Sequence, residues 1–256
     1  MILSVDIGIR HLSLCIMDCT DKNDLATYKI HLWDVYDTLE NDTYLCKSLQ
    51  KSGKVCNKKC GFKYNDIHCC KTHFPKNLLP IKKENYFKPK LIKQYLLQDI
   101  AKIILTKVQL IYDTNKDIFN KLTNIILELQ PSMNKSMIFV SHLIYGKLTS
   151  LQIQGKLEPK CTIKFVRASQ KLKAYTGPDI ICKLKGKYAQ RKWFSIQYTK
   201  WFLENKFSNQ QKELWLPKLN SKSTQADMSD CYLMNINLLH GIHKKQKMNF
   251  KKTNID

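Results

Sequence analysis

Residues 2–18 have the sequence ILSVDIGIRHLSLCIMD, in which two short apolar runs are separated by Gly8. Apolar runs of this length on either side of a turn residue predict two strands of a hairpin. Further strands are expected over residues 28–36, 124–130 and 161–166, and helices over residues 90–112, 135–148, 188–205 and 224–240. Three strands followed by helices that alternate with two more strands predict an α/β protein with a mixed sheet.

Acidic residues are most informative where they interrupt an apolar strand. Asp6 and Glu128 each lie within such a run, where an unpaired carboxylate is costly unless a metal ion or a counter-charge offsets its burial. Asp227 and Asp230 lie three residues apart near the start of the last helix and therefore share one face. Mg²⁺ prefers hard oxygen ligands, so these four acids are the candidate catalytic and magnesium-binding residues.

Each of these acids also has a simpler explanation. Asp6 and Glu128 could be acids at strand ends that face water. Thr224 to Asp227 matches a capping box, and Asp230 could merely complement the dipole of the helix. The occurrence of all four in this order is what favours a metal-dependent nuclease.

The charge of the chain predicts a polyanionic partner. The 256 residues carry 43 Lys and Arg against 21 Asp and Glu, a net charge of +22, and the basic residues are spread along the chain. Such an excess concentrates phosphates at the protein surface, which favours nucleic acid as the partner. The hydrophobic fraction of 43% is enough for a core in one domain with an insertion.

Basic and aromatic residues are interleaved after the strand expected at residues 161–166. Lys and Arg side chains in such runs neutralise phosphates without reading base sequence. The predicted DNA-binding residues are Arg167, Lys171, Lys173, Tyr175, Lys187, Arg191 and Lys192. The large aromatic residues Trp193, Phe194 and Trp201 are expected in the core instead.

Residues 37–88 are rich in Lys and Cys and lack a long apolar periodicity, which predicts an inserted module. Cys70 and His73 are spaced as a two-ligand knuckle, and Cys46 and Cys56 can complete a structural Zn²⁺ site that would let so polar a segment fold. Two further arrangements stay open: Cys60 in place of Cys56, or Cys69 in place of Cys70. Unrelated free thiols are the remaining alternative.

The other five cysteines are predicted to be small buried apolar residues of strands and helices: Cys15, Cys19, Cys161, Cys182 and Cys231.

Ten cysteines without a secretory leader after Met1 favour an intracellular protein with reduced or metal-bound thiols. No stretch reaches the ~20 apolar residues that a membrane helix needs, so no membrane contact is expected. Residues 244–256 are expected to form a flexible basic tail.

Four segments of the chain resemble the RuvC-type Holliday junction resolvases. Residues 4–13 (SVDIGIRHLS) resemble their first-strand motif, and residues 126–131 (ILELQP), followed by Asn134 and Ser136, resemble their central strand. Residues 226–230 (ADMSD) resemble their last helix, although Gln225 stands where relatives often have Asp or Lys. Residues 171–175 (KLKAY) resemble the basic loop of the poxvirus and mitochondrial branch, and the poxvirus-type enzymes of large DNA viruses are the most similar.

The resemblance implies a ribonuclease-H-like nuclease domain over residues 1–36 and 89–243, with the zinc-binding insertion at residues 37–88. It implies two Mg²⁺ or Mn²⁺ ions per active site, bound by Asp6, Glu128, Asp227 and Asp230. It further implies hydrolysis of four-way and other branched DNA, a homodimer, and a place at viral DNA replication sites in the cytoplasm or nucleus of a host cell.

Three other functions remain to be weighed. Asp6-Ile7-Gly8 also resembles the phosphate loop of sugar-kinase and actin-like ATPases, but those need a second Asp-x-Gly and a Gly-rich loop, and this chain has eight Gly. A non-catalytic zinc-containing DNA-binding protein would account for the charge and the cysteines but not for acids in apolar strands. A ribonuclease or transposase-like nuclease stays open, since carboxylates do not identify the substrate.

Overall fold

The computed structural model of the chain describes residues 1–39, 44–88 and 91–239. Five strands form the central sheet in the order β3-β2-β1-β6-β7. The strands β1 (Ile2–Asp6), β2 (His11–Cys19) and β3 (Tyr28–Asp37) pair antiparallel, whereas β6 (Asn124–Leu129) and β7 (Thr162–Arg167) continue the sheet parallel to β1. This order, with these directions, is ribonuclease-H-like. The predicted mixed five-stranded sheet is confirmed.

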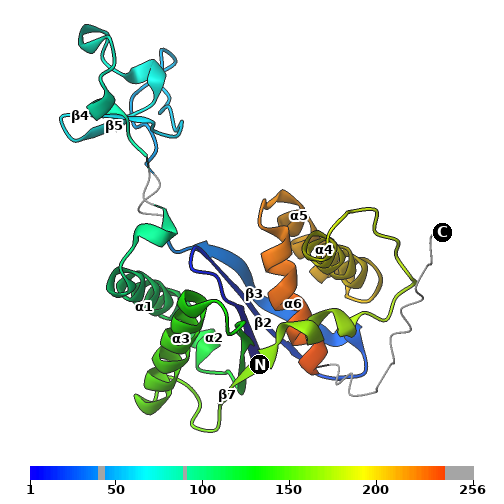
Figure 1. The fold of residues 1–256 in the computed structure, drawn as a ribbon. Coiled ribbons are helices and arrows are strands. Elements are labelled where there is room, and N and C mark those ends of the chain that lie inside the picture. Colours follow the sequence, from blue (N-terminus) through cyan, green and yellow to red (C-terminus); the bar gives the residue numbers. More distant parts are fainter. Residues whose placement is uncertain (40–43, 89–90, 240–256) are drawn as a thin grey trace.

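Helices cover both faces of the sheet, which is why the central strands are apolar on both sides. On one face lie α1 (Leu97–Thr114), α2 (Lys116–Phe119) and α3 (Lys135–Ile153), and on the other lie α4 (Lys187–Asn205), α5 (Asn209–Ser221) and α6 (Gln225–Leu239) (Figure 1). Successive strand residues point to opposite faces. Leu3 and Val5 of β1 accordingly pack toward α1 and α3, and Ile2 packs toward α6.

Three buried hydrogen bonds hold α6 against the sheet. Ser4 Oγ donates to the carbonyl of Cys231 at 2.6 Å, and Trp33 Nε1 donates to the carbonyl of Met228 at 2.8 Å. Asn235 Nδ2 donates to the carbonyl of Cys15 at 2.8 Å. These bonds fix where α6 lies along β1 and β2, and therefore where its first turns meet the sheet.

Several element bounds differ from the prediction. The first long helix begins at Leu97, because residues 92–94 form a separate 3₁₀ turn, η6 (Ile92–Gln94). The helix expected to end at residue 148 continues to Ile153. Helix α5 was not predicted, since it is polar and contains Pro217. Other 3₁₀ turns are η1 (Leu25–Thr27) and η7 (Ala168–Ala174), and the expected basic tail lies outside the described residues.

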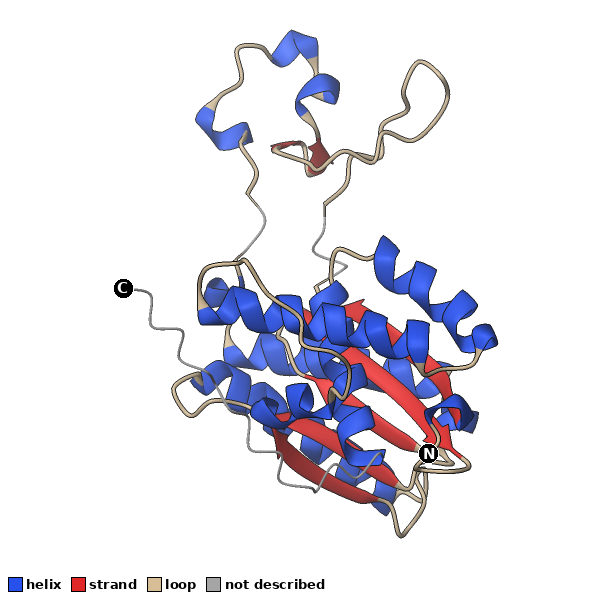
Figure 2. Cartoon of the chain, turned by 90° about the vertical axis from the view of Figure 1, so that its right-hand side faces the viewer, coloured by secondary structure: helices blue, strands red, loops and turns tan. Residues whose placement is uncertain are grey.

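Residues 44–88 form a small module with a core of its own. It contains the antiparallel pair β4 (Phe62–Tyr64) and β5 (Ile67–Cys69) and the turns η3 (Lys71–His73), η4 (Lys76–Leu78) and η5 (Lys83–Asn85) (Figure 2). Its buried residues are five cysteines and Phe74. So small a core favours a bound metal as the main source of stability.

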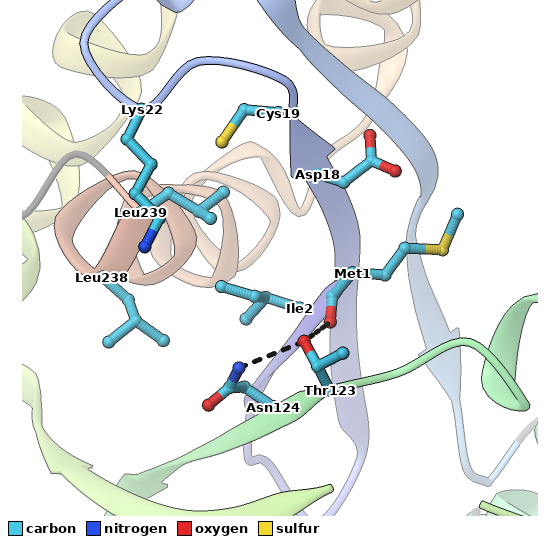
Figure 3. A pocket seen from close by; sticks show the side chains of 9 residues that line it. All are labelled: Met1, Ile2, Asp18, Cys19, Lys22, Thr123, Asn124, Leu238 and Leu239. Atoms are coloured by element: carbon cyan, nitrogen blue, oxygen red, sulfur yellow. Dashed lines mark hydrogen bonds between the residues drawn. The ribbon is translucent and has the colours of Figure 1, made fainter. Parts of the chain in front are cut away.

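A hollow of about 320 Å³ lies where β1 and β6 begin (Figure 3). Its lining includes Met1, Asp18 and Leu239, and Thr123 Oγ1 donates a hydrogen bond to the carbonyl of Met1 at 3.0 Å. Since β1 runs from Ile2 to Asp6, this hollow is at the opposite end of the strand from Asp6. Among the described residues, no helix has the length and apolar character to cross a membrane.

Candidate active site

The four predicted acids meet at one end of the sheet. Asp6 is the last residue of β1, and Glu128 lies near the end of β6. The parallel register pairs Val5 with Leu127, so the next residues, Asp6 and Glu128, lie side by side, close enough for each carboxyl group to shift the pKa of the other. Asp227 and Asp230 come from the first turns of α6, which packs on β1.

Two lysines link these acids. Lys171 of η7 places its Nζ 2.9 Å from Glu128 Oε1 and 2.7 Å from Asp230 Oδ2. Lys192 of α4 places its Nζ 2.6 Å from Asp227 Oδ1 and 3.5 Å from Asp230 Oδ2. The side chain of Lys171 is only 13% exposed and that of Asp230 only 7%. Five elements thus bring four acids and two ammonium groups together.

The electrostatics show that negative charge is crowded at this point. Burial, together with the hydrogen bond to Glu128, raises the pKa of Asp6 well above its usual value. Burial also acts to raise the pKa of Glu128, but the hydrogen bond from Asp6 and the charge of Lys171 outweigh it and lower this pKa. The two pKa values move in opposite directions because like charges so close together cannot both ionise readily.

The lysines stay charged in spite of their burial. Desolvation acts to lower the pKa of Lys171 and of Lys192, but nearby carboxylates, Asp230 first among them, raise both pKa values. If all four acids were ionised, these two ammonium groups would leave a net local charge of −2. A divalent cation supplies that balance.

The residues present fit Mg²⁺ or Mn²⁺. The donor set consists of carboxylate oxygens from three elements, as these hard cations prefer. Ser13 is the β2 partner of Asp6, and Ser229 lies next to Asp230. The hydroxyl oxygens of both serines are buried and have no hydrogen-bond partner within the part of the chain that the structure describes. Ser13, as the cross-strand neighbour of Asp6, lies on the same face of the sheet as that acid.

Sequence reasoning did not single out three further neighbours of the acids. His11 at the start of β2 has its Nδ1 3.6 Å from Asp227 Oδ2. Ser195 Oγ donates to Asp230 Oδ1, and Gln130 Nε2 donates to Glu128 Oε2 at 3.4 Å. The spacing of Lys192 and Ser195 was an available signal, because residues three apart share one helix face, as Asp227 and Asp230 do.

The predicted DNA-binding residues occupy three kinds of position. Exposed ones flank the site on β7, η7 and α4: Arg167, Lys173, Lys187 and Arg191. Lys171 and Lys192 point among the acids instead. Tyr175 stacks flat on Tyr198, with ring centroids 3.8 Å apart, and its hydroxyl donates to the carbonyl of Pro178 at 2.8 Å. DNA contact by these seven residues stays a prediction.

The four predicted zinc ligands converge within the small module. The ligand atoms of Cys46, Cys56, Cys70 and His73 all lie within 4.8 Å of one another. His73 Nδ1 is 3.4 Å from both Cys46 Sγ and Cys70 Sγ, and Cys56 Sγ is 3.8 Å from Cys70 Sγ. A zinc tetrahedron with Zn–S bonds of about 2.3 Å has S–S edges of about 3.8 Å, so these distances fit Zn²⁺.

One thiol of this cluster is shifted toward the metal-binding form, whereas hydrogen bonds with Cys70 and Cys46 contribute to a raised pKa of Cys56. Burial acts to raise the pKa of Cys46, but hydrogen bonds from Ser48, the Cys70 backbone and His73 lower it to about 6, toward the thiolate that binds metal. Cys60 and Cys69 are buried nearby but lie outside the set. Among the other cysteines, two depart from the expected burial: Cys19, at the end of β2, and Cys182, in the irregular segment before α4, are only half-buried.

Comparisons with known proteins give weak similarities. No protein-family model matches the chain. It is 27% identical over 263 residues to "Uncharacterized protein L451" of Acanthamoeba polyphaga mimivirus, a match that covers 90% of this chain and 58% of that protein. The chain thus spans less than two thirds of the relative's length.

Solved structures with a similar backbone include the yeast mitochondrial Holliday junction resolvase Ydc2, at 14% identity and a TM-score of 0.49, covering 93% of this chain and 77% of that one. The fowlpox virus resolvase, solved with Holliday junction DNA, has 13% identity and a TM-score of 0.46, and the match covers 95% of this chain and 99% of the fowlpox chain. Thermus thermophilus RuvC has 10% identity and a TM-score of 0.43, and the match covers 94% of this chain and 96% of the RuvC chain. The function therefore rests on the chain's own side chains.

Proposed function

We propose that the protein is a metal-dependent endonuclease that resolves four-way and other branched DNA junctions by phosphodiester hydrolysis. The observation that carries the proposal is the convergence of Asp6, Glu128, Asp227 and Asp230 at one end of the sheet, beside Lys171 and Lys192. The net charge of +22 supports a nucleic acid substrate. The choice of branched DNA rests on the sequence motifs around the acids.

Each part of the site has a role in this reaction. Bound Mg²⁺ or Mn²⁺ would polarise the scissile phosphate and assist attack by water. Asp6 and Glu128 hold their oxygens at the ends of adjacent central strands, so that a phosphate can be positioned with little movement of the protein. Lys171 orients Glu128 and Asp230, and Lys192 orients Asp227. Both ammonium groups can offset negative charge that develops on the phosphate.

We further propose that Cys46, Cys56, Cys70 and His73 bind one structural Zn²⁺, which stabilises the small module.

A homodimer is also proposed, because symmetric resolution of a four-way junction requires two active sites. We also propose a place at sites of viral DNA replication in a host cell, which rests on the resemblance of the sequence motifs to the resolvases of large DNA viruses.

The experiment that tests the proposed function compares three DNA substrates of matched sequence: linear, nicked and four-way. With Mg²⁺, the wild-type protein is expected to cut the four-way junction in preference to the other two. Cutting of all three at equal rates would retain the nuclease but reject junction selectivity. Cutting of none, in folded protein that binds DNA, would reject the nuclease.

One observation favours a second candidate, a non-catalytic zinc-containing DNA-binding protein. Lys171 and Lys192 already form short ion pairs with the acids, as they would in a purely structural network. A structural network would make DNA binding independent of Mg²⁺ and leave DNA uncut. The burial of Asp6 beside Glu128, which raises the pKa of Asp6, weighs against this candidate, since two lysines do not need four acids to form a structural ion-pair network.

A further inference from the structure

Residues 45–59 of the small module form a short two-stranded hairpin. Leu45 bridges to Lys59 and Leu49 bridges to Val55 in antiparallel fashion. Backbone hydrogen bonds run from Cys46 N to Lys58 O at 2.8 Å and from Cys56 N to Ser48 O at 2.9 Å. The chain reverses at Gly53, which adopts a φ of 77° that favours glycine. The hairpin therefore has a defined register and a tight tip.

Every charged side chain on this hairpin is a lysine. Five lysines occur in residues 45–59 and no acid, and all five are exposed: Lys47, Lys51, Lys54, Lys58 and Lys59. None of them forms an ion pair with an acid of the described residues, whereas Lys63, just beyond the hairpin, is paired with Asp66 at 2.7 Å. Mutual repulsion of five unpaired cations indicates a surface selected for a polyanion rather than for stability.

The candidate zinc ligands lie on both strands of the hairpin. Cys46 comes from the first strand and Cys56 from the second, and their thiols belong to one cluster with Cys70 and His73. A metal bound there links the two strands directly. The lysines would then be presented by a rigid element, so that little conformational entropy is lost when they bind.

We propose that this hairpin is a second DNA-binding surface, separate from the carboxylate site, whose lysines contact the phosphates of duplex DNA. Duplex DNA carries one charge per ~1.7 Å of its axis, a density that suits closely spaced lysines. Lysine contacts to phosphate carry no base information, so binding should be independent of sequence. The proposal rests on the proposed function only in taking DNA as the polyanion.

The test uses the full-length variant Lys51→Ala/Lys54→Ala at the tip of the hairpin. Its affinity for a four-way junction and for a linear duplex is measured by fluorescence anisotropy across a salt series, without Mg²⁺ and without chelator, so that zinc is retained. We expect a loss of roughly 3- to 10-fold at low salt and a decrease of about 1 to 2 in the slope of log affinity against log salt. Both DNAs should show the same change.

A matched control removes two exposed lysines of the nuclease body, Lys102→Ala/Lys121→Ala, with the same change in net charge. The control is expected to keep an affinity and slope close to wild type, and Lys51→Arg/Lys54→Arg should bind as wild type does. An unchanged slope in the tip variant would overturn the proposal. So would an equal loss in the control, because the effect would then reflect net charge alone.

Failure of this inference and failure of the proposed function are separable. If the carboxylate site is not catalytic, the wild-type protein fails to cut any DNA, but the binding comparison can still be made. If the hairpin does not bind DNA, the tip variant binds and cuts as wild type does. When the carboxylate site is catalytic and the hairpin binds DNA, the tip variant needs more DNA for half-maximal cutting but reaches the wild-type maximal rate.

Discussion

At the scale of single residues, sequence reasoning located the acids better than the lysines. Asp6 and Glu128 stood out because a carboxylate in an apolar strand is costly, and the parallel register then brings them together. Lys171 and Lys192 were predicted only as DNA-binding residues, although Lys171 also belongs to the motif KLKAY. Nothing in a run of lysines shows which of them turns inward, because that depends on the path of η7 and on the packing of α4.

Replacing Lys171 tests whether its ammonium group balances the buried acids. In Lys171→Met, Glu128 and Asp230 lose a partner at 2.9 Å and 2.7 Å. Without divalent ions, we expect the free energy of unfolding to fall by about 3 kcal/mol. Mg²⁺ should stabilise this variant more than wild type, as measured by chemical denaturation with and without the ion. The exposed neighbour variant Lys173→Met serves as control, and an equal loss there would contradict the assignment.

At the scale of elements, the strands were predictable and the connections were not. Short apolar runs identify β1, β2 and β6 from composition alone. Turn η7, which carries Lys171, and helix α5, which contains Pro217, have no comparable apolar pattern, since their form depends on contacts with the rest of the fold. Hydrogen bonds from Ser4, Trp33 and Asn235 then decide where α6 presents its two acids.

Replacing Asp227 tests whether this residue only caps helix α6 or also takes part in cutting DNA. Its carboxylate contacts Lys192 and His11, from two other elements. Asp227→Asn should therefore cost at most about 1 kcal/mol of stability, because the side chain is partly exposed, but should greatly reduce cutting of junction DNA. Denaturation and cleavage assays on the same preparation decide the question. Wild-type cutting by this variant would leave Asp227 as a helix cap only.

At the scale of the whole molecule, the chain combines a mixed five-stranded sheet with a cysteine-based module. The composition of residues 37–88 predicted the module and the spacing of Cys70 and His73 predicted its metal site, but spacing alone could not choose between Cys56 and Cys60 or between Cys70 and Cys69. The choice comes from the three-dimensional path of the hairpin at residues 45–59, which brings Cys46 and Cys56 to Cys70 and His73.

The purified protein is expected to contain about one Zn²⁺ per chain. Cys70→Ser should lose the metal and much of the stability of the module, whereas Cys182→Ser, outside the cluster, should keep both. Elemental analysis and thermal unfolding of the two variants measure these effects. Folded wild-type protein without zinc, or equal zinc content in both variants, would contradict the assignment.

The central claim is that Asp6 and Glu128 are catalytic, and the most direct measurement is Mg²⁺-dependent cutting of a four-way junction by Asp6→Asn and Glu128→Gln. Each substitution keeps the shape of the side chain and removes the charge that a Mg²⁺ ligand supplies. We predict that wild type cuts, that both variants lose roughly 100-fold or more of the cutting rate, and that both bind the junction at least as tightly as wild type. Full cutting activity in both variants would contradict the account.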